Sequence, residues 1–188
     1  TKGFDPGTAN NPYRGFVYTS FQERATKVSH QNVSKLARAA GDETLQVICN
    51  TIASDEARHE RAYTKFMGYL FEQDPTGALL AFRDVLQNQI VMPAQNMGGT
   101  GGPDLFEHFS AVAQRLGVYT AEHYAQIVTH LVERWRVESL AGLTGEAAAA
   151  QEYVCTLGPR YRRLAERASR RATPAPPQAF SWIFGRAA

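Results

Sequence analysis

The chain has 188 residues, of which 44% are hydrophobic and 20% charged, so it is long enough for one globular core or for part of a larger one. The formal net charge of +2 does not indicate a nucleic-acid partner, and no apolar run approaches the roughly 18 residues that a membrane span needs. Cys49 and Cys155 lack the spacing of a disulfide framework, which favours a reducing compartment.

Helical periodicity extends along nearly the whole chain, and no segment shows the convincing alternation of a β-strand. The first three helices are predicted at about 13–39, 42–73 and 75–91. Their boundaries follow from a glycine stop, two aspartate N-caps and a proline at a first helical position, which are Gly41, Asp42, Asp74 and Pro75. The sequence therefore predicts an all-α fold from its first half alone.

A glycine-rich loop at 92–104 separates these helices from three more. The later helices are predicted at about 105–116, from Thr120 onward, and after Thr144. The last of them should be interrupted at Gly158-Pro159, because proline cannot continue the backbone hydrogen-bond ladder. We expect residues 1–172 to form one helical domain, and the proline-rich and then aromatic tail at 173–188 to pack back onto it.

An acid and a histidine interrupt the apolar stripe of the second predicted helix. Glu56 and His59 lie one turn apart on a face that also carries Ile52, Tyr63, Phe66 and Leu70. If that stripe faces a core, the buried carboxylate costs several kcal/mol unless a cation neutralises it. The cation is either a protein side chain, such as an arginine, or a metal.

The preceding helix carries a face of hydrogen-bonding groups where a core helix normally has leucine and isoleucine. The face consists of Thr19, Gln22, Glu23, Thr26, His30 and Val33. Two antiparallel helices, one with Glu23 and the next with Glu56 and His59, make half of a carboxylate-bridged dinuclear iron site. The alternative is that Glu56 and His59 hydrogen-bond to each other or to an arginine.

Several long stretches of the chain resemble the soluble acyl-[acyl-carrier-protein] desaturases, the stearoyl type. They are GFVYTSFQERAT, DEARHERAYTK, MPA at 92–94, LFEHFSAVAQRLGVYTAEHYA, RWRVESLAGLTGEAAAAQEYVC and FSWIF. The resemblance implies a ferritin-like helical bundle, a homodimer, and two iron ions reduced by ferredoxin. It further implies that dioxygen is used to introduce a cis double bond into a saturated acyl chain on acyl carrier protein, in bacterial cytoplasm or in the plastid stroma.

The resemblance also assigns roles to individual residues. It makes Glu23, Glu56 and His59 iron ligands, Thr26 a hydroxyl beside the dioxygen site, and Asp55 and His30 groups that orient the ligands. The acyl tunnel would be lined by Pro6, Thr8, Gly15, Phe16, Tyr18, Thr19, Gln22, Met92 and Phe106. Glu107 would lie near the phosphopantetheine arm of the carrier, although a helix N-terminus also favours an acid there.

The family's other glutamate and its second Glu-x-x-His are missing from this sequence. The chain begins at Thr1 and its first residues read like the inside of a protein, so we expect it to be the C-terminal two-thirds of a desaturase without its N-terminal helices. Two alternatives remain: two copies supply the ligands between them, or the chain is an inactive helical scaffold or interaction fragment.

Overall fold

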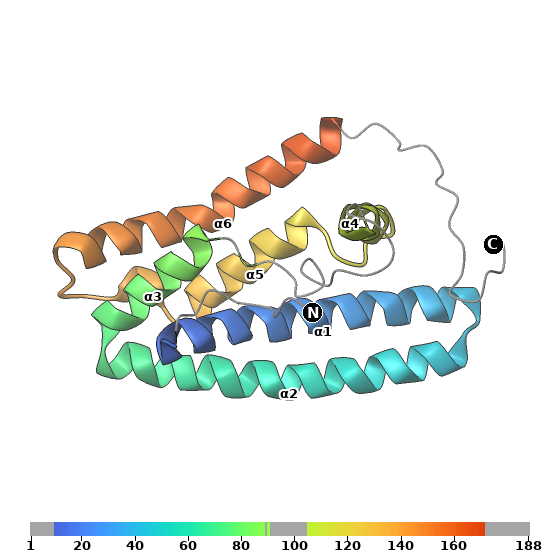
Figure 1. Cartoon of the computed structure of the whole chain (residues 1–188), viewed down its shortest axis with the longest axis horizontal. Helices are drawn as coiled ribbons and strands as arrows, with labels where there is room; N and C mark the ends of the chain where they lie inside the picture. The colour runs from blue at the N-terminus through green and yellow to red at the C-terminus, as the bar shows by residue number, and fades with distance from the viewer. Residues whose placement is uncertain (1–9, 89, 91–104, 172–188) are drawn as a thin grey trace.

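The computed structural model of the chain describes residues 10–88, 90 and 105–171 (Figure 1). These residues form α-helices and one short 3-10 helix, and no strand occurs among them, which confirms the all-α prediction. The elements are α1 (Pro12–Ala40), α2 (Glu43–Gln73), α3 (Pro75–Gln87), α4 (Leu105–Arg115), α5 (Ala121–Arg134), η2 (Val137–Ser139) and α6 (Gly145–Arg171).

Two long antiparallel helices, α1 and α2, form one side of the bundle (Figure 1). The turn between them is set locally: Gly41 closes α1 at φ 78°, a left-handed conformation that glycine adopts without steric cost. Asp42 then caps α2 by accepting a hydrogen bond from the Leu45 N–H at 2.9 Å. Asp74 closes α2 and caps α3 by accepting from the Gly77 N–H, also at 2.9 Å. The predicted boundaries of this region are confirmed.

The hydrophobic core lies where α3 and α5 pack on α1 and α6 packs on α3 and α5 (Figure 1). Its largest fully buried side chains are Phe21, Met67, Leu79, Phe82, Leu86, Ile127, Leu131 and Leu157. Trp135, at the end of α5, also contacts α2 and α3. The centre of its ring lies 5.4 Å from that of Phe71 in a tilted arrangement and 4.9 Å from that of Phe82 in an edge-to-face arrangement, and its indole N–H donates to the Thr64 carbonyl at 3.0 Å. This contact fixes the end of α5 against α2.

Two helix predictions need correction. The third helix ends at Gln87, capped by Asn88, and does not continue to about Val91. The last helix is not interrupted at Pro159 but continues to Arg171, bending partway along its length (Figure 1). It stays helical because Leu157 and Tyr161, on either side of the proline, both pack on the core and offset the lost backbone hydrogen bond.

The face of α2 that turns inward also differs from the prediction. The buried residues are Cys49, Ala53, Glu60, Thr64, Met67 and Phe71. In the predicted stripe, His59 and Phe66 are exposed and the remaining members are only partly buried. The reason is that α1 covers a neighbouring face of α2, while no helix in the described part of the chain covers the side away from it (Figure 1).

The predicted loop at 92–104 and the predicted docking of the tail at 173–188 both lie outside the described residues. Among the helices that the structure does describe, none combines the length and the apolar character needed to cross a membrane.

Candidate metal centre

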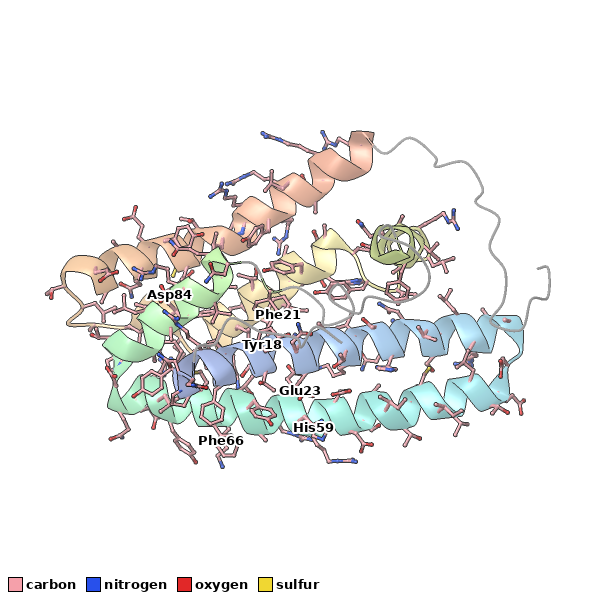
Figure 2. All side chains as sticks on the ribbon, in the orientation of Figure 1. Tyr18, Phe21, Glu23, His59, Phe66 and Asp84 are labelled. Atoms are coloured by element: carbon pink, nitrogen blue, oxygen red, sulfur yellow. The ribbon has the colours of Figure 1, made fainter. Side chains whose placement is uncertain are left out.

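Three potential metal ligands meet between α1 and α2. Glu23 of α1 and Glu56 and His59 of α2 each offer one ligand atom, and these atoms lie within 4.8 Å of one another. The Nδ1 atom of His59 is 3.2 Å from Glu23 Oε2 and 3.5 Å from Glu56 Oε2. Figure 2 shows Glu23 and His59 at the same level along the two helices.

The backbone explains this meeting. Glu56 and His59 are one helical turn apart, so they share a face of α2, and the antiparallel α1 brings Glu23 against that face. The two carboxylate side chains are mostly buried, at 17% and 19% exposure, whereas the imidazole is 56% exposed. The site is therefore closed on the side of the carboxylates and open on the side of the histidine.

The two carboxyl groups perturb each other. Burial raises the pKa of Glu23, and the hydrogen bond and negative charge of Glu56 raise it further, to about 7, although His59 acts in the opposite direction. Burial also acts to raise the pKa of Glu56, but hydrogen bonds with Glu23 and His59 outweigh it and hold that pKa below its usual range. A proton on Glu23, donated to the Glu56 carboxylate, thus relieves their repulsion.

A metal ion relieves the same repulsion, and the donor set fits one. Two carboxylates and an imidazole are suitable ligands for iron, zinc or manganese, and together they can occupy one side of a coordination sphere. The alternative in which an arginine neutralises Glu56 does not fit the nearby side chains, because Arg24 pairs with Glu60 and Arg58 pairs with Asp55. The mutual hydrogen bonding of Glu23, Glu56 and His59 is present and is compatible with metal binding.

The expected supporting residues lie at different distances from this centre. The Thr26 hydroxyl lies one turn from Glu23, at 3.1 Å from its carbonyl oxygen, and also helps to lower the pKa of Glu56. His30 lies one turn further, where its Nδ1 is 2.9 Å from the Thr26 carbonyl oxygen. Asp55 forms its ion pair with Arg58 on the surface of α2. Of these three residues, the structure brings only Thr26 to the ligands.

Five of the residues expected to line an acyl tunnel lie on the first three turns of α1: Gly15, Phe16, Tyr18, Thr19 and Gln22. The Thr19 hydroxyl donates to the Gly15 carbonyl at 2.9 Å, and Gln22 Nε2 donates to the Tyr18 hydroxyl at 3.3 Å. A side chain added at Gly15 would meet no atom within 4 Å. Pro6, Thr8 and Met92, and the side chains of Phe106 and Glu107, lie outside the described residues.

One polar cluster was missed by the sequence analysis. Glu60, only 7% exposed, accepts a hydrogen bond from Arg24 Nη1 at 2.5 Å and another from the Lys27 ammonium group. The Nε2 atom of His130 on α5 lies 3.5 Å from the same carboxylate. The sequence did contain a signal for this burial. Glu60 lies one turn after Glu56 and two turns after Ala53, so it shares the face of α2 on which Ala53 is buried.

A cavity of about 400 Å³ lies elsewhere in the described structure, between α4, α5 and α6. Its lining includes Tyr119, Tyr124, Tyr161 and Leu164 and shares no residue with the metal centre. Burial raises the pKa of both Tyr119 and Tyr124, so these phenols are neutral at physiological pH.

Comparison with known proteins identifies the family to which this sequence is similar. A family model described as fatty acid desaturase matches residues 1–184. The chain is 58% identical to "Stearoyl-[acyl-carrier-protein] 9-desaturase 5, chloroplastic" of Oryza sativa subsp. japonica, covering 98% of the chain and 47% of that protein. It is 59% identical to "Stearoyl-[acyl-carrier-protein] 9-desaturase, chloroplastic" of Spinacia oleracea, covering 98% and 46%. It is 58% identical to "Stearoyl-[acyl-carrier-protein] 9-desaturase 6, chloroplastic" of Arabidopsis thaliana, covering 98% and 48%.

The chain spans about half the length of these curated relatives, so the expected share of two-thirds is wrong.

Proposed function

The chain belongs to the fatty acid desaturase family, and on that premise we propose that it forms one side of the di-iron centre of an acyl-[acyl-carrier-protein] desaturase. In the proposed reaction a saturated acyl chain on its carrier loses two hydrogen atoms and gains a cis double bond. Reduced ferredoxin supplies two further electrons, solvent supplies two protons, and dioxygen is reduced to two molecules of water.

The meeting of Glu23, Glu56 and His59 is the observation that carries this proposal. Carboxylates are hard anionic ligands that can bridge two iron ions, and one imidazole per iron leaves coordination positions open. Bound iron would supply the activation of dioxygen. The protein's part is to hold two mostly buried carboxylates close enough that they need a shared cation, which disfavours the metal-free state at neutral pH.

The rest of the ligand set would come from the N-terminal half of the protein. The open side of α2 supports this arrangement, because it combines the exposed imidazole of His59 with large exposed hydrophobic side chains. These are Leu45, Val47, Ile48, Phe66 and Tyr69, at 39–63% exposure. Hydrophobic side chains in such number on one helix usually mark a surface that another segment covers.

The acyl chain would run along the α1 face that leads to the ligands. Gly15 leaves open space, and the hydroxyl of Thr19 is turned back to the helix by its hydrogen bond to the Gly15 carbonyl. The Thr19 hydroxyl is therefore already bonded within the helix and presents less polar character to a neighbouring acyl chain. The Thr26 hydroxyl interacts with the Glu56 carboxylate and is suited to move a proton beside the two carboxylates.

The relatives' names support acyl carrier protein as the carrier that presents the substrate. Ferredoxin as the electron donor and a dimer of the complete protein are proposed from the family resemblance alone. The relatives are named as chloroplastic, so of the two expected compartments the plastid has support and the bacterial cytoplasm has none.

Metal analysis and turnover of the complete protein test the proposal. The protein containing this chain and its upstream half should hold two iron ions per chain and desaturate stearoyl-carrier substrate with reduced ferredoxin. Glu23→Ala should abolish both properties. A complete protein without iron would instead favour the alternative of an inactive helical scaffold.

A further inference from the structure

A second cluster joins the same two helices beside the metal centre. The Glu60 side chain is 9% exposed and lies between two cations of α1, with Arg24 Nη1 at 2.5 Å from Oε1 and Lys27 Nζ hydrogen-bonded to Oε2. From α5, the Nε2 atom of His130 approaches Oε1 to 3.5 Å. We refer to Arg24, Lys27, Glu60 and His130 as the Glu60 cluster.

Sequence adjacency places the Glu60 cluster at the level of the metal ligands. Arg24 directly follows Glu23, and Glu60 directly follows His59. Consecutive residues of an α-helix differ by about 100° around the axis, so the two clusters occupy neighbouring faces of the same helix pair. The metal ligands use the open face, and the Glu60 cluster uses the face turned toward α5.

The Glu60 cluster restricts how α1 can slide along α2. A shift by one residue moves a helix by about 1.5 Å along its axis and turns its side chains by about 100°, which breaks the contacts of Glu60 with both cations. The buried residues close by in sequence include Ala25 and Ala53, whose small side chains resist sliding less than large interlocking ones. A mostly buried carboxylate with two donors is costly to separate from them.

The Glu60 cluster also balances charge next to a site for a cation. Arg24 and Lys27 each form an ion pair with the Glu60 carboxylate, so its negative charge lies directly between the two cations. Without that negative charge, two adjacent cations would oppose metal binding. Charge balance and register are thus two separate ways in which Glu60 can act on the ligands, and they predict different measurements.

We propose that Glu60 is a positioning residue for the metal centre: by holding Arg24 and Lys27 it fixes the register of α1 on α2 and so sets Glu23 against Glu56 and His59. This role rests on the proposed function, in that the three ligands must bind metal. It concerns residues that touch neither substrate nor metal and that act through the ligands beside them.

Cobalt binding to the complete protein tests this role without turnover. Co²⁺ replaces iron as the probe, and its visible absorption reports the arrangement of its ligands. Glu60→Gln should weaken Co²⁺ binding at least about tenfold and change the absorption spectrum. Lys27→Gln, which leaves the Arg24–Glu60 pair in place, should have a smaller effect in the same direction and serves if Glu60→Gln fails to fold.

Asp84→Asn is the matched control. Asp84 also holds two cations, Arg14 at 2.5 Å and Arg83 at 2.7 Å, but it joins α1 to α3, away from the ligands. Its loss should lower the melting temperature of the metal-free protein while leaving Co²⁺ affinity and absorption unchanged. Equal loss of affinity in Asp84→Asn and Glu60→Gln overturns the proposal, because it makes the effect one of general stability.

The double variant Glu60→Gln with Arg24→Gln separates register from charge. If Glu60 acts by positioning, the additional removal of the Arg24 charge does not restore the Co²⁺ absorption spectrum of the unmodified protein. A normal spectrum in Glu60→Gln, with affinity restored in the double variant, would reduce the role to charge balance and overturn the proposal. Unmodified protein that binds no Co²⁺ overturns the proposed function as well, whereas Glu60→Gln binding like the unmodified protein overturns the positioning role alone.

Discussion

Glu23→Gln should make the metal-free protein more stable at pH 8 while removing a metal ligand. In the folded protein burial and Glu56 raise the pKa of Glu23 from 4.5 to about 7, so the folded state holds a proton that the unfolded chain has already released. Stability therefore falls as the pH rises between these values. Glutamine cannot ionise and can donate to the Glu56 carboxylate, so it avoids this loss.

The magnitude follows from the same displacement. A pKa moved from 4.5 to about 7 corresponds to at most roughly 3 kcal/mol of unfolding free energy. Partial solvent exposure and the lowered pKa of Glu56 offset much of it, so we expect about 1–2 kcal/mol at pH 8. For a protein of this size or larger, that is a rise of roughly 2–8 °C in melting temperature.

Thermal unfolding of the metal-free protein at pH 5 and pH 8 is the assay. The gain from Glu23→Gln should be present at pH 8 and much smaller at pH 5, where Glu23 of the folded protein is protonated and only the ionisation of the unfolded chain contributes. Glu72→Gln, at an exposed position on α2, is the control and should change neither value. A gain of equal size at both pH values, or destabilisation at pH 8, would refute the electrostatic reasoning.

Three further predictions concern the ligands and the packing. His59→Ala should abolish stoichiometric metal binding but leave the far-ultraviolet circular dichroism nearly unchanged, because the imidazole is 56% exposed. Trp135→Phe should lower the unfolding free energy by about 1–2 kcal/mol in denaturant titration, because it leaves the Thr64 carbonyl without its donor. Gly158→Ala should destabilise by more than about 1 kcal/mol, since its new methyl group would lie 2.3 Å from the Thr129 hydroxyl, and Thr129→Ala should recover part of the loss.

Local signals in the sequence were sufficient for the helix ends at the two tight turns that join α1 to α2 and α2 to α3. Gly41, Asp42 and Asp74 act through backbone groups a few residues away, so their effect does not depend on the rest of the fold. Pro159 is a local signal that failed, because core contacts on both sides hold α6 together. Periodicity likewise identified α2 as amphipathic but assigned its buried face wrongly, since that face depends on which helix covers it.

The same distinction explains what was found of the site. Glu56 and His59 lie on one helix, and Glu23 is conspicuous on a polar face of the preceding helix, so spacing alone suggested that they meet. The Glu60 cluster depends on α5, far along the chain, and a glutamate among charged neighbours on a helix normally indicates solvent. Its burial appears only when the helices are assembled.

The two clusters differ in a way that bears on how the centre works. The Glu60 carboxylate lies between two cations of this chain. Glu23 and Glu56 instead lie against each other and share one imidazole, so a proton or a metal ion is needed to relieve their repulsion. Both clusters lie between α1 and α2. The Glu60 cluster can therefore hold the two helices in place, while Glu23 and Glu56 remain available to bind a cation. In the proposed metal site, Glu23, Glu56 and His59 are thereby brought together before any cation binds, and the repulsion between the two carboxylates would contribute to the driving force for metal binding.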